Sequence, residues 1–112
     1  MNCRQEFVDH VAEKSVLCAF VDKRTGYDDQ GEQTYDCHSL PMFYDDSVYK
    51  TFLKSLDFEY DDGYGGQEVY GTIWYTDGTW SERGEYDGSE WWSFQSCPAI
   101  PDSLKSKVGE VK

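Results

Sequence analysis

Four carboxylates lie close together late in the chain, where a pair of them could serve as general acid and base. The nine residues from position 82 include Glu82, Glu85, Asp87 and Glu90. Glycoside hydrolysis needs two carboxyl groups in a cleft with separated pKa values. With 22 acidic residues among 112, some pair falls at a suitable distance by chance, and little chain is left to build a cleft. We therefore favour a solvated acidic face over a catalytic pair.

Arg83 is a second candidate, because it is the one basic residue between positions 55 and 104. If it lies beside Trp74 and Trp92 on one sheet face, it could hold a planar anionic ligand in an aromatic cage. The structural alternative is a cation–π stack with a salt bridge to Glu85 or Glu90, and we favour this alternative. The residues kept as ligand-binding candidates are Arg83, Trp74, Trp92 and Tyr70.

Metal, phosphate and nucleophile sites have weaker signals. The cysteine and histidine spacing matches no known zinc pattern; the residues concerned are Cys18, Cys37, His38, Cys97 and His10. Residues 57–63 lack the order of a calcium loop, and no lysine follows the glycines at 63–66. No serine or cysteine stands in a nucleophile elbow. We expect four free thiols, no bound metal, no cofactor and no enzymatic activity.

The net charge of −12 is the strongest feature of the composition. Eleven acids and one base lie between positions 55 and 104, in the half that also carries all four tryptophans. Such a surface repels nucleic acid and membranes and favours basic protein partners. The chain has no hydrophobic run of membrane-spanning length and no basic-then-apolar N-terminus. We therefore expect a cytoplasmic protein whose cysteines stay reduced.

The elements that must position these side chains are indicated first by two Asp-Gly pairs. Asp77-Gly78 and Asp87-Gly88 each lie between aromatic and β-branched residues, which is the strongest short-range hairpin signal. They predict a three-stranded antiparallel meander over 68–76, 79–86 and 90–96.

The meander would carry aromatic side chains on both faces. If both turns are two-residue loops, Tyr75 lies opposite Trp80, and Glu85 opposes Glu90 as a like-charge pair that costs stability. One face then shows Val69, Ile73, Tyr75, Trp80, Tyr86 and Trp91, and the other Tyr70, Trp74, Arg83, Trp92 and Phe94. A small domain normally covers one such face, so the second lies under another element or is used for binding.

The rest of the chain predicts two helices and two further strands. Apolar residues at helical spacing predict a helix over 2–14, capped by Asn2, and a helix over 46–56 opened by acidic residues. Residues 16–21 are typical of a strand, 24–33 of a polar loop, and 34–43 of a strand interrupted at Pro41. The predicted helix over 46–56 should pack on the sheet through Phe52, Leu53 and Leu56.

The order α-β-β-α-β-β-β predicts an α+β fold, a single small domain with an antiparallel sheet and one or two helices packed on it. We place the domain at 1–104 and expect a flexible tail at 105–112.

The segment GYGGQEVYGTIWYTDGTWSERGEYDGSEWW, with the tyrosine at 60 before it, resembles a group of small, uncharacterised tailed-phage proteins. The shared features are a Y-x-x-G-Y-G-G-Q-E lead at 60–68, a D-G-T-W turn at 77–80 and a G-E-Y-D-G-S-E-W-W ending at 84–92. The resemblance implies a phage origin, and it brings no activity or catalytic residue with it.

Small, strongly acidic phage proteins are similar in general character to inhibitors that mimic nucleic acid and block restriction or CRISPR effectors. Same-face side chains along a strand recur at about 6.6–6.8 Å, close to twice the roughly 3.4 Å phosphate step of one DNA strand. We therefore expect an acidic inhibitor, in the host cytoplasm, that binds the basic surface of a nucleic-acid-handling defence enzyme and binds no nucleic acid itself. Its partner-binding residues would be Asp57, Glu59, Asp61, Asp62, Glu82, Glu85, Asp87, Glu90 and Trp92.

The alternative function is a ligand-binding module. In that case an exposed aromatic face with Arg83 would sequester a nucleotide-like signal, and binding would respond less to salt than binding by phosphate mimicry.

Overall fold

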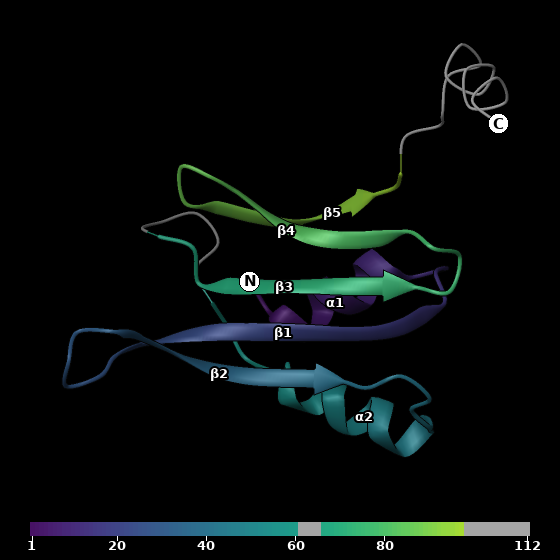
Figure 1. Cartoon of the computed structure of the whole chain (residues 1–112), viewed down its shortest axis with the longest axis horizontal. Coiled ribbons are helices and arrows are strands. Elements are labelled where there is room, and N and C mark those ends of the chain that lie inside the picture. Colours follow the sequence, from purple (N-terminus) through teal and green to yellow (C-terminus); the bar gives the residue numbers. More distant parts are fainter. Residues whose placement is uncertain (61–65, 98–112) are drawn as a thin grey trace, which may run out of the picture.

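The computed structural model describes residues 1–60 and 66–97, and Figure 1 shows how their helices and strands are arranged. In chain order these elements are α1 (Cys3–Val11), β1 (Val16–Tyr27), β2 (Gln33–Leu40), α2 (Asp46–Ser55), β3 (Val69–Tyr75), β4 (Trp80–Tyr86) and β5 (Ser89–Gln95). The α+β prediction with a C-terminal meander is confirmed. The predicted tail and the boundary at 104 lie outside the described residues.

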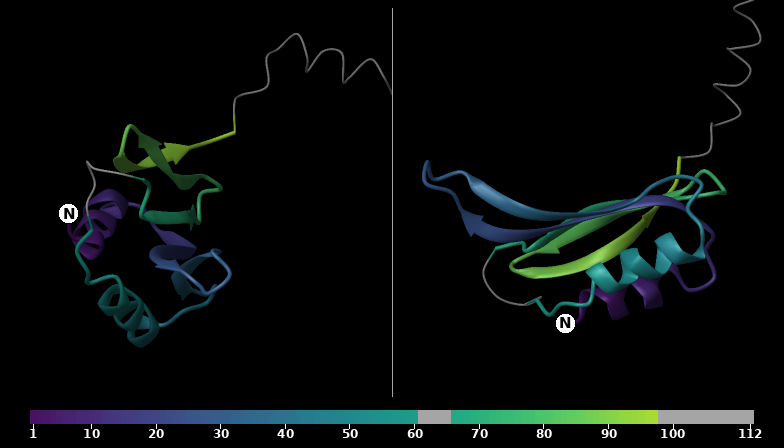
Figure 2. Two further views of the ribbon diagram at one scale, coloured as in Figure 1. Left: turned by 90° about the vertical axis from the view of Figure 1, so that its left-hand side faces the viewer. Right: turned by 90° about the horizontal axis from the view of Figure 1, so that it is seen from below.

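The strands form one antiparallel sheet in the order β2-β1-β3-β4-β5. β1 pairs with β2 on one side and with β3 on the other, so the N-terminal hairpin and the meander join along it. Both helices lie against the same side of the sheet (Figure 2). We call this side the covered face; the other is the open face, over which no helix or strand of the described residues lies.

Both helices begin at the caps that the sequence predicts. The Asn2 side chain accepts a hydrogen bond from the Gln5 N–H at 2.9 Å, and the Asp45 carboxylate accepts one from the Val48 N–H at 2.9 Å. Each cap satisfies a backbone donor that the first helical turn leaves free. No helix among the described residues is long and apolar enough to cross a membrane.

The core lies between the covered face and the two helices. Phe7 of α1 and Phe52 of α2 meet edge to face, with ring centroids 5.4 Å apart. Phe52 and Leu56 are buried and Leu53 is half-buried, so the predicted packing of α2 is confirmed. The sheet contributes mainly Val16, Ala19, Val21, Leu40, Val69, Ile73 and Tyr75.

The first hairpin differs from the prediction. β1 continues to Tyr27, through the first four residues of the segment predicted as a loop over 24–33. A bulge between Arg24 and Gly26 shifts the pairing by one residue, and Gly26 has a φ of 142°, which a glycine adopts readily. Polar residues therefore continue the strand here because β2 pairs with it as far as Tyr27, although the pairing with β3 ends at Lys23.

The two Asp-Gly turns are both hairpin turns, as predicted, but they differ in length. Asp87 and Gly88 have φ values of 54° and 88°, the geometry of a two-residue loop, and Glu85 opposes Glu90 as expected. At the first turn Trp74 pairs with Trp80, and the Tyr75 N–H donates to the Thr79 carbonyl at 3.0 Å. That loop is one residue longer than assumed, so the predicted pairing of Tyr75 with Trp80 is wrong.

The longer loop changes which residues share a face, because a one-residue slip exchanges the two sides of a strand. The covered face carries Val69, Ile73, Tyr75, Ser81, Arg83, Glu90, Trp92 and Phe94. The open face carries Phe20, Tyr35, Tyr70, Trp74, Trp80, Glu82, Tyr86 and Trp91. The prediction that Arg83 and Trp92 share a face with Trp74 and Tyr70 is therefore wrong.

Candidate functional site

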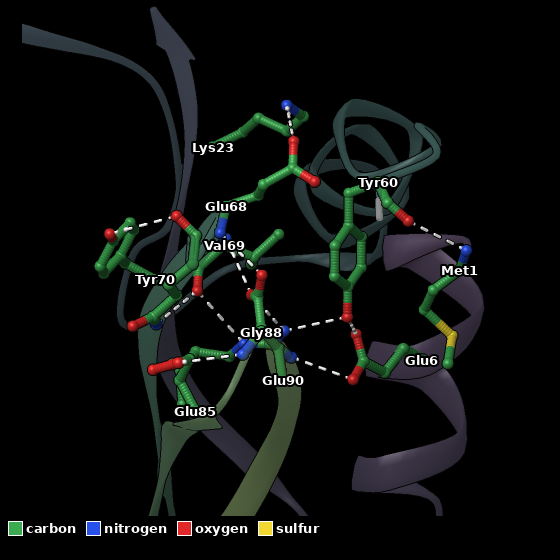
Figure 3. Close-up of polar contacts among 12 residues, drawn as sticks. Met1, Glu6, Lys23, Tyr60, Glu68, Val69, Tyr70, Glu85, Gly88 and Glu90 are labelled. Carbon is green, nitrogen blue, oxygen red and sulfur yellow. Dashed lines mark hydrogen bonds and ion pairs between the residues drawn. The ribbon is translucent and has the colours of Figure 1, made fainter. Parts of the chain in front are cut away.

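A buried ionic network surrounds Arg83 under the covered face, and Figure 3 labels its members Glu6, Tyr60 and Glu90. Its Nη2 donates to Glu90 Oε1 at 3.0 Å and to the Tyr60 hydroxyl at 2.9 Å, while Nη1 lies 3.0 Å from Glu6 Oε2. The contact of Nη1 is an ion pair that lacks the alignment of a hydrogen bond. The guanidinium also stacks over Trp92, with 5.0 Å between its carbon and the ring centroid.

Glu90 is the most enclosed member of this network. Its carboxylate accepts the backbone N–H groups of Glu68 at 2.7 Å and Val69 at 3.0 Å in addition to the Arg83 guanidinium. These hydrogen bonds fix the start of β3 against β5. The like-charge opposition of Glu85 and Glu90 is offset because Glu90 turns inward to Arg83, whereas Glu85 accepts the Gly88 N–H at 3.3 Å.

Tyr60 and Glu6 close the network on the side of α1. The Tyr60 hydroxyl donates to Glu6 Oε1, and burial, followed by this hydrogen bond, raises the pKa of Tyr60. Burial acts against the charged form of Arg83, but Glu6, Tyr60 and Glu90 outweigh it and raise the pKa of Arg83. The guanidinium therefore stays charged and links α1, β3, β4 and β5.

This geometry corrects three of the predicted site residues. The exposed side-chain fraction is 2% for Arg83 and 0% for Glu90, and Trp92 as a whole residue is 6% exposed. Arg83 and Trp92 cannot line an open ligand cage, and the buried side chains of Glu90 and Trp92 cannot supply the carboxylate and aromatic contacts predicted for a partner. The structural alternative for Arg83, a cation–π stack with a salt bridge to Glu90, is what the structure contains.

The remaining predicted carboxylates do not form one row. Glu82 lies on the open face, where it accepts the Trp80 indole N–H at 3.0 Å, whereas Glu85 lies on the covered face and Asp87 in the turn. Asp57 and Glu59 are exposed beyond the end of α2. Asp61 and Asp62 lie outside the described residues. Phosphate mimicry by a regular carboxylate ladder is therefore not built into these strands.

The open face instead presents large aromatic side chains to solvent. The exposed fractions are 36% for Phe20, 40% for Tyr35, 41% for Trp74, 42% for Trp91 and 78% for Tyr86. Phe20 and Trp74 lie with ring centroids 6.0 Å apart, and Tyr35 meets Tyr70 edge to face at 5.6 Å. Monomeric proteins rarely expose contiguous apolar surface of this kind without using it.

Trp91 owes its position to Gly84, the residue opposite it on β4. A Cβ atom at position 84 would come within 2.6 Å of the Trp91 indole. The glycine therefore lets the indole lie across the neighbouring strand, where a larger residue would push it outward. Trp74 and Tyr70 were predicted for one aromatic face of the meander and Trp91 for the other, whereas Phe20 and Tyr35 were predicted for neither. Phe20 and Tyr35 are each the single aromatic residue in 18–22 and 33–37, so no alternation indicates them.

A second polar cluster lies at the other end of the covered face. Ser81 is fully buried, and its hydroxyl is 2.8 Å from His10 Nε2 and 2.7 Å from the Tyr75 hydroxyl. The His10 ring stacks on Phe94 with centroids 3.9 Å apart. Serine, histidine and tyrosine in hydrogen-bond contact could suggest nucleophilic catalysis, but the Ser81 hydroxyl is closed off from solvent. We therefore interpret the cluster as structural.

This cluster predicts a pH dependence of stability. Burial, and secondarily Arg83, lowers the pKa of His10 below its usual 6.5. Below pH 6.5 the unfolded chain binds a proton at His10 that the folded protein resists, so stability is present above this pH and lost as pH falls below it. Urea titrations across this range should show the loss in the parent and less of it in His10→Gln. His38→Gln is the matched control. If it reduces the pH dependence of the unfolding free energy as much as His10→Gln does, the pH dependence is not due to His10.

Comparison with known proteins gives no relative from which a function could be transferred. No family model matches the chain, and neither characterised proteins nor solved structures gave a significant match. Among the described residues no three histidine, cysteine, aspartate or glutamate side chains are grouped as metal ligands.

Proposed function

We propose that this protein is a non-enzymatic inhibitor that docks on the basic surface of a nucleic-acid-handling protein, as expected for an acidic phage antagonist of host restriction or CRISPR defence. The observation that carries the proposal is the open face: aromatic side chains are exposed there on a chain of net charge −12. Aromatic residues are enriched where protein interfaces bind most strongly.

The two features would play different parts in binding. The aromatic side chains of the open face supply apolar area that is removed from water when a partner docks. The carboxylates act together through their field, which steers a basic partner toward the protein and makes the association rate dependent on salt. Because Glu82 and Glu85 lie on opposite faces, we propose a summed field in place of a row that imitates successive phosphates.

The test begins with a host lysate, from which the tagged protein should capture a DNA- or RNA-binding protein at low salt. With that partner purified, Trp74→Ala and Trp91→Ala should each weaken binding about 30-fold, the factor that corresponds to roughly 2 kcal/mol. Phe43→Ala is the control, because Phe43 is 94% exposed but lies outside the sheet. Calorimetry at two salt concentrations measures the affinities.

Two further experiments test whether the carboxylates speed association and whether the protein blocks nucleic-acid binding by the partner. The double variant Glu85→Gln and Asp87→Asn should lower the association rate at low salt and leave dissociation nearly unchanged. Duplex nucleic acid should compete with the protein for the partner's basic surface. The proposal fails if both tryptophan variants bind as the parent does, or if nucleic acid and the protein bind the partner together.

A second function, capture of a planar anionic ligand, is favoured by one observation. Arg24 pairs with Tyr35 across β1 and β2, and Tyr35 meets Tyr70 edge to face on the open face, so a cation lies beside two tyrosine rings. Arg24 would then take the part first assigned to Arg83, with Tyr70 and Tyr35 as the stacking surfaces. In that case Arg24→Gln would abolish binding of the ligand, while Glu85→Gln with Asp87→Asn would have little effect.

A further inference from the structure

β5 is an edge strand whose outer side has no neighbouring strand among the described residues. Tyr86 and Ser89 close a two-residue loop and so exchange hydrogen bonds across the hairpin, and the ladder alternates from there. The backbone N–H and C=O groups of Glu90, Trp92 and Phe94 therefore point away from β4, toward the free edge. They form a row of donors and acceptors that an added strand could pair with.

This edge lacks the features that usually protect a sheet edge. Ser89–Gln95 contains no proline and no lysine, and its pairing with β4 runs without a bulge. Its one charged side chain, Glu90, turns inward to Arg83. Trp91 and Phe94 are 42% and 52% exposed beside it. Monomeric proteins normally protect such an edge from pairing with another strand.

A shallow groove runs between this edge and α1, with a volume of about 370 Å³. Its walls include Gln5, Glu6, Asp9 and His10 from the helix and Trp91 and Trp92 from the strand. Asp9 accepts a hydrogen bond from Gln5 at 2.9 Å and has no ion-pair partner in the described part of the chain. The Trp92 indole N–H is buried beside the groove without an acceptor among the same residues.

We propose that the outer edge of β5 accepts an extended, lysine- or arginine-rich segment of a partner protein as an added strand. Its backbone would pair with the outward groups of Glu90, Trp92 and Phe94, and alternate side chains would enter the groove toward Asp9. A second copy of the chain is disfavoured as occupant, because each copy carries a net charge of −12. The inference rests on the proposed function only in assuming a basic partner. It can be tested with a short peptide in place of the whole partner protein.

The probe is a short peptide with lysine at every second position and valine or threonine between, added to the full-length protein. Amide hydrogen exchange followed by NMR should show the N–H groups of Glu90, Trp92 and Phe94 slowed about tenfold or more by the peptide. A peptide with glutamate in place of lysine should not bind. A lysine peptide N-methylated at alternate residues, so that its pairing edge has no donors, should give no slowing.

Charge reversal at the groove supplies the matched variants. Asp9→Lys should weaken peptide affinity about fivefold or more at physiological salt, where charges beyond about 8 Å are screened. Asp29→Lys changes the net charge equally in the exposed loop between β1 and β2 and should change affinity less than about twofold.

Three results would overturn the inference. In the first, the three amides already exchange slowly in the free monomer, which means that the chain covers its own edge. In the second, they slow only as concentration rises and the mass doubles, which makes a second copy the occupant. Equal binding of the N-methylated peptide would show attraction without strand pairing. If the peptide binds at this edge but no nucleic-acid-handling protein is captured from lysate, the edge site stands and the proposed function fails.

Discussion

Replacing Arg83 with methionine should lower the free energy of unfolding by about 3–5 kcal/mol, the usual cost of removing one partner from a buried ionic group. Arg83→Met leaves Glu90 fully buried and Glu6 largely buried without their shared cation. Glu90 would keep the N–H groups of Glu68 and Val69, but hydrogen bonds alone do not neutralise a charge in the interior. Urea denaturation monitored by tryptophan fluorescence measures the loss.

A double-mutant cycle separates the ion pair from simple packing. If charge is the cause, Glu90→Gln in the Arg83→Met background should cost much less than Glu90→Gln alone, because the remaining buried charge is removed. Lys50→Met provides the surface control, since Lys50 pairs with Asp46 where both side chains are mostly exposed, and it should be nearly neutral. Additive losses in the cycle would show that Arg83 acts through its bulk and not its charge.

Phe52→Ala should have an effect of similar size, about 3–5 kcal/mol, because Phe52 is 4% exposed and fills the space between α2 and Phe7. The alanine side chain leaves a cavity that the two helices can close only in part. Phe43→Ala removes the same atoms from a residue that is 94% exposed and should change stability little. Equal effects in the two variants would contradict the packing described for α2.

The sequence alone predicts the order of the elements, the caps at Asn2 and Asp45, and the burial of Phe52, because each depends on a local signal. The two Asp-Gly pairs show where such local signals stop being sufficient. The same dipeptide forms a longer loop at Asp77-Gly78, where the Asp77 carboxylate accepts the Thr79 N–H at 2.9 Å and the Lys14 ammonium at 3.0 Å. Lys14 is remote in the sequence, so the loop length depends on tertiary structure.

The candidate site, like the fold, was predictable only where local sequence signals determine it. An aromatic meander with one face left for binding follows from the sequence, and Tyr70 and Trp74 do lie on the open face. The assignment of Arg83 and Trp92 to that face failed with the register, since one residue of loop length exchanges the faces of β4 and β5 relative to β3. The partners of Arg83 at Glu6 and Tyr60 come from distant segments that no spacing rule connects.

The strand order has a consequence for how the chain folds. The β1–β2 hairpin and the β3–β4–β5 meander each form from segments that are neighbours in the sequence. The pairing of β1 with β3 instead joins residues that are distant in the sequence, from Val16 with Tyr75 to Lys23 with Val69. The chain loses conformational entropy in closing the long loop between β1 and β3 before any contact between these strands compensates for it. Sheets built on such distant pairings fold slowly. The docking of the two halves along β1 is therefore the step expected to limit the folding rate. Until it is complete, the inner edges of β1 and β3 stay unpaired, and the Arg83 network, which needs α1 and the meander together, cannot form.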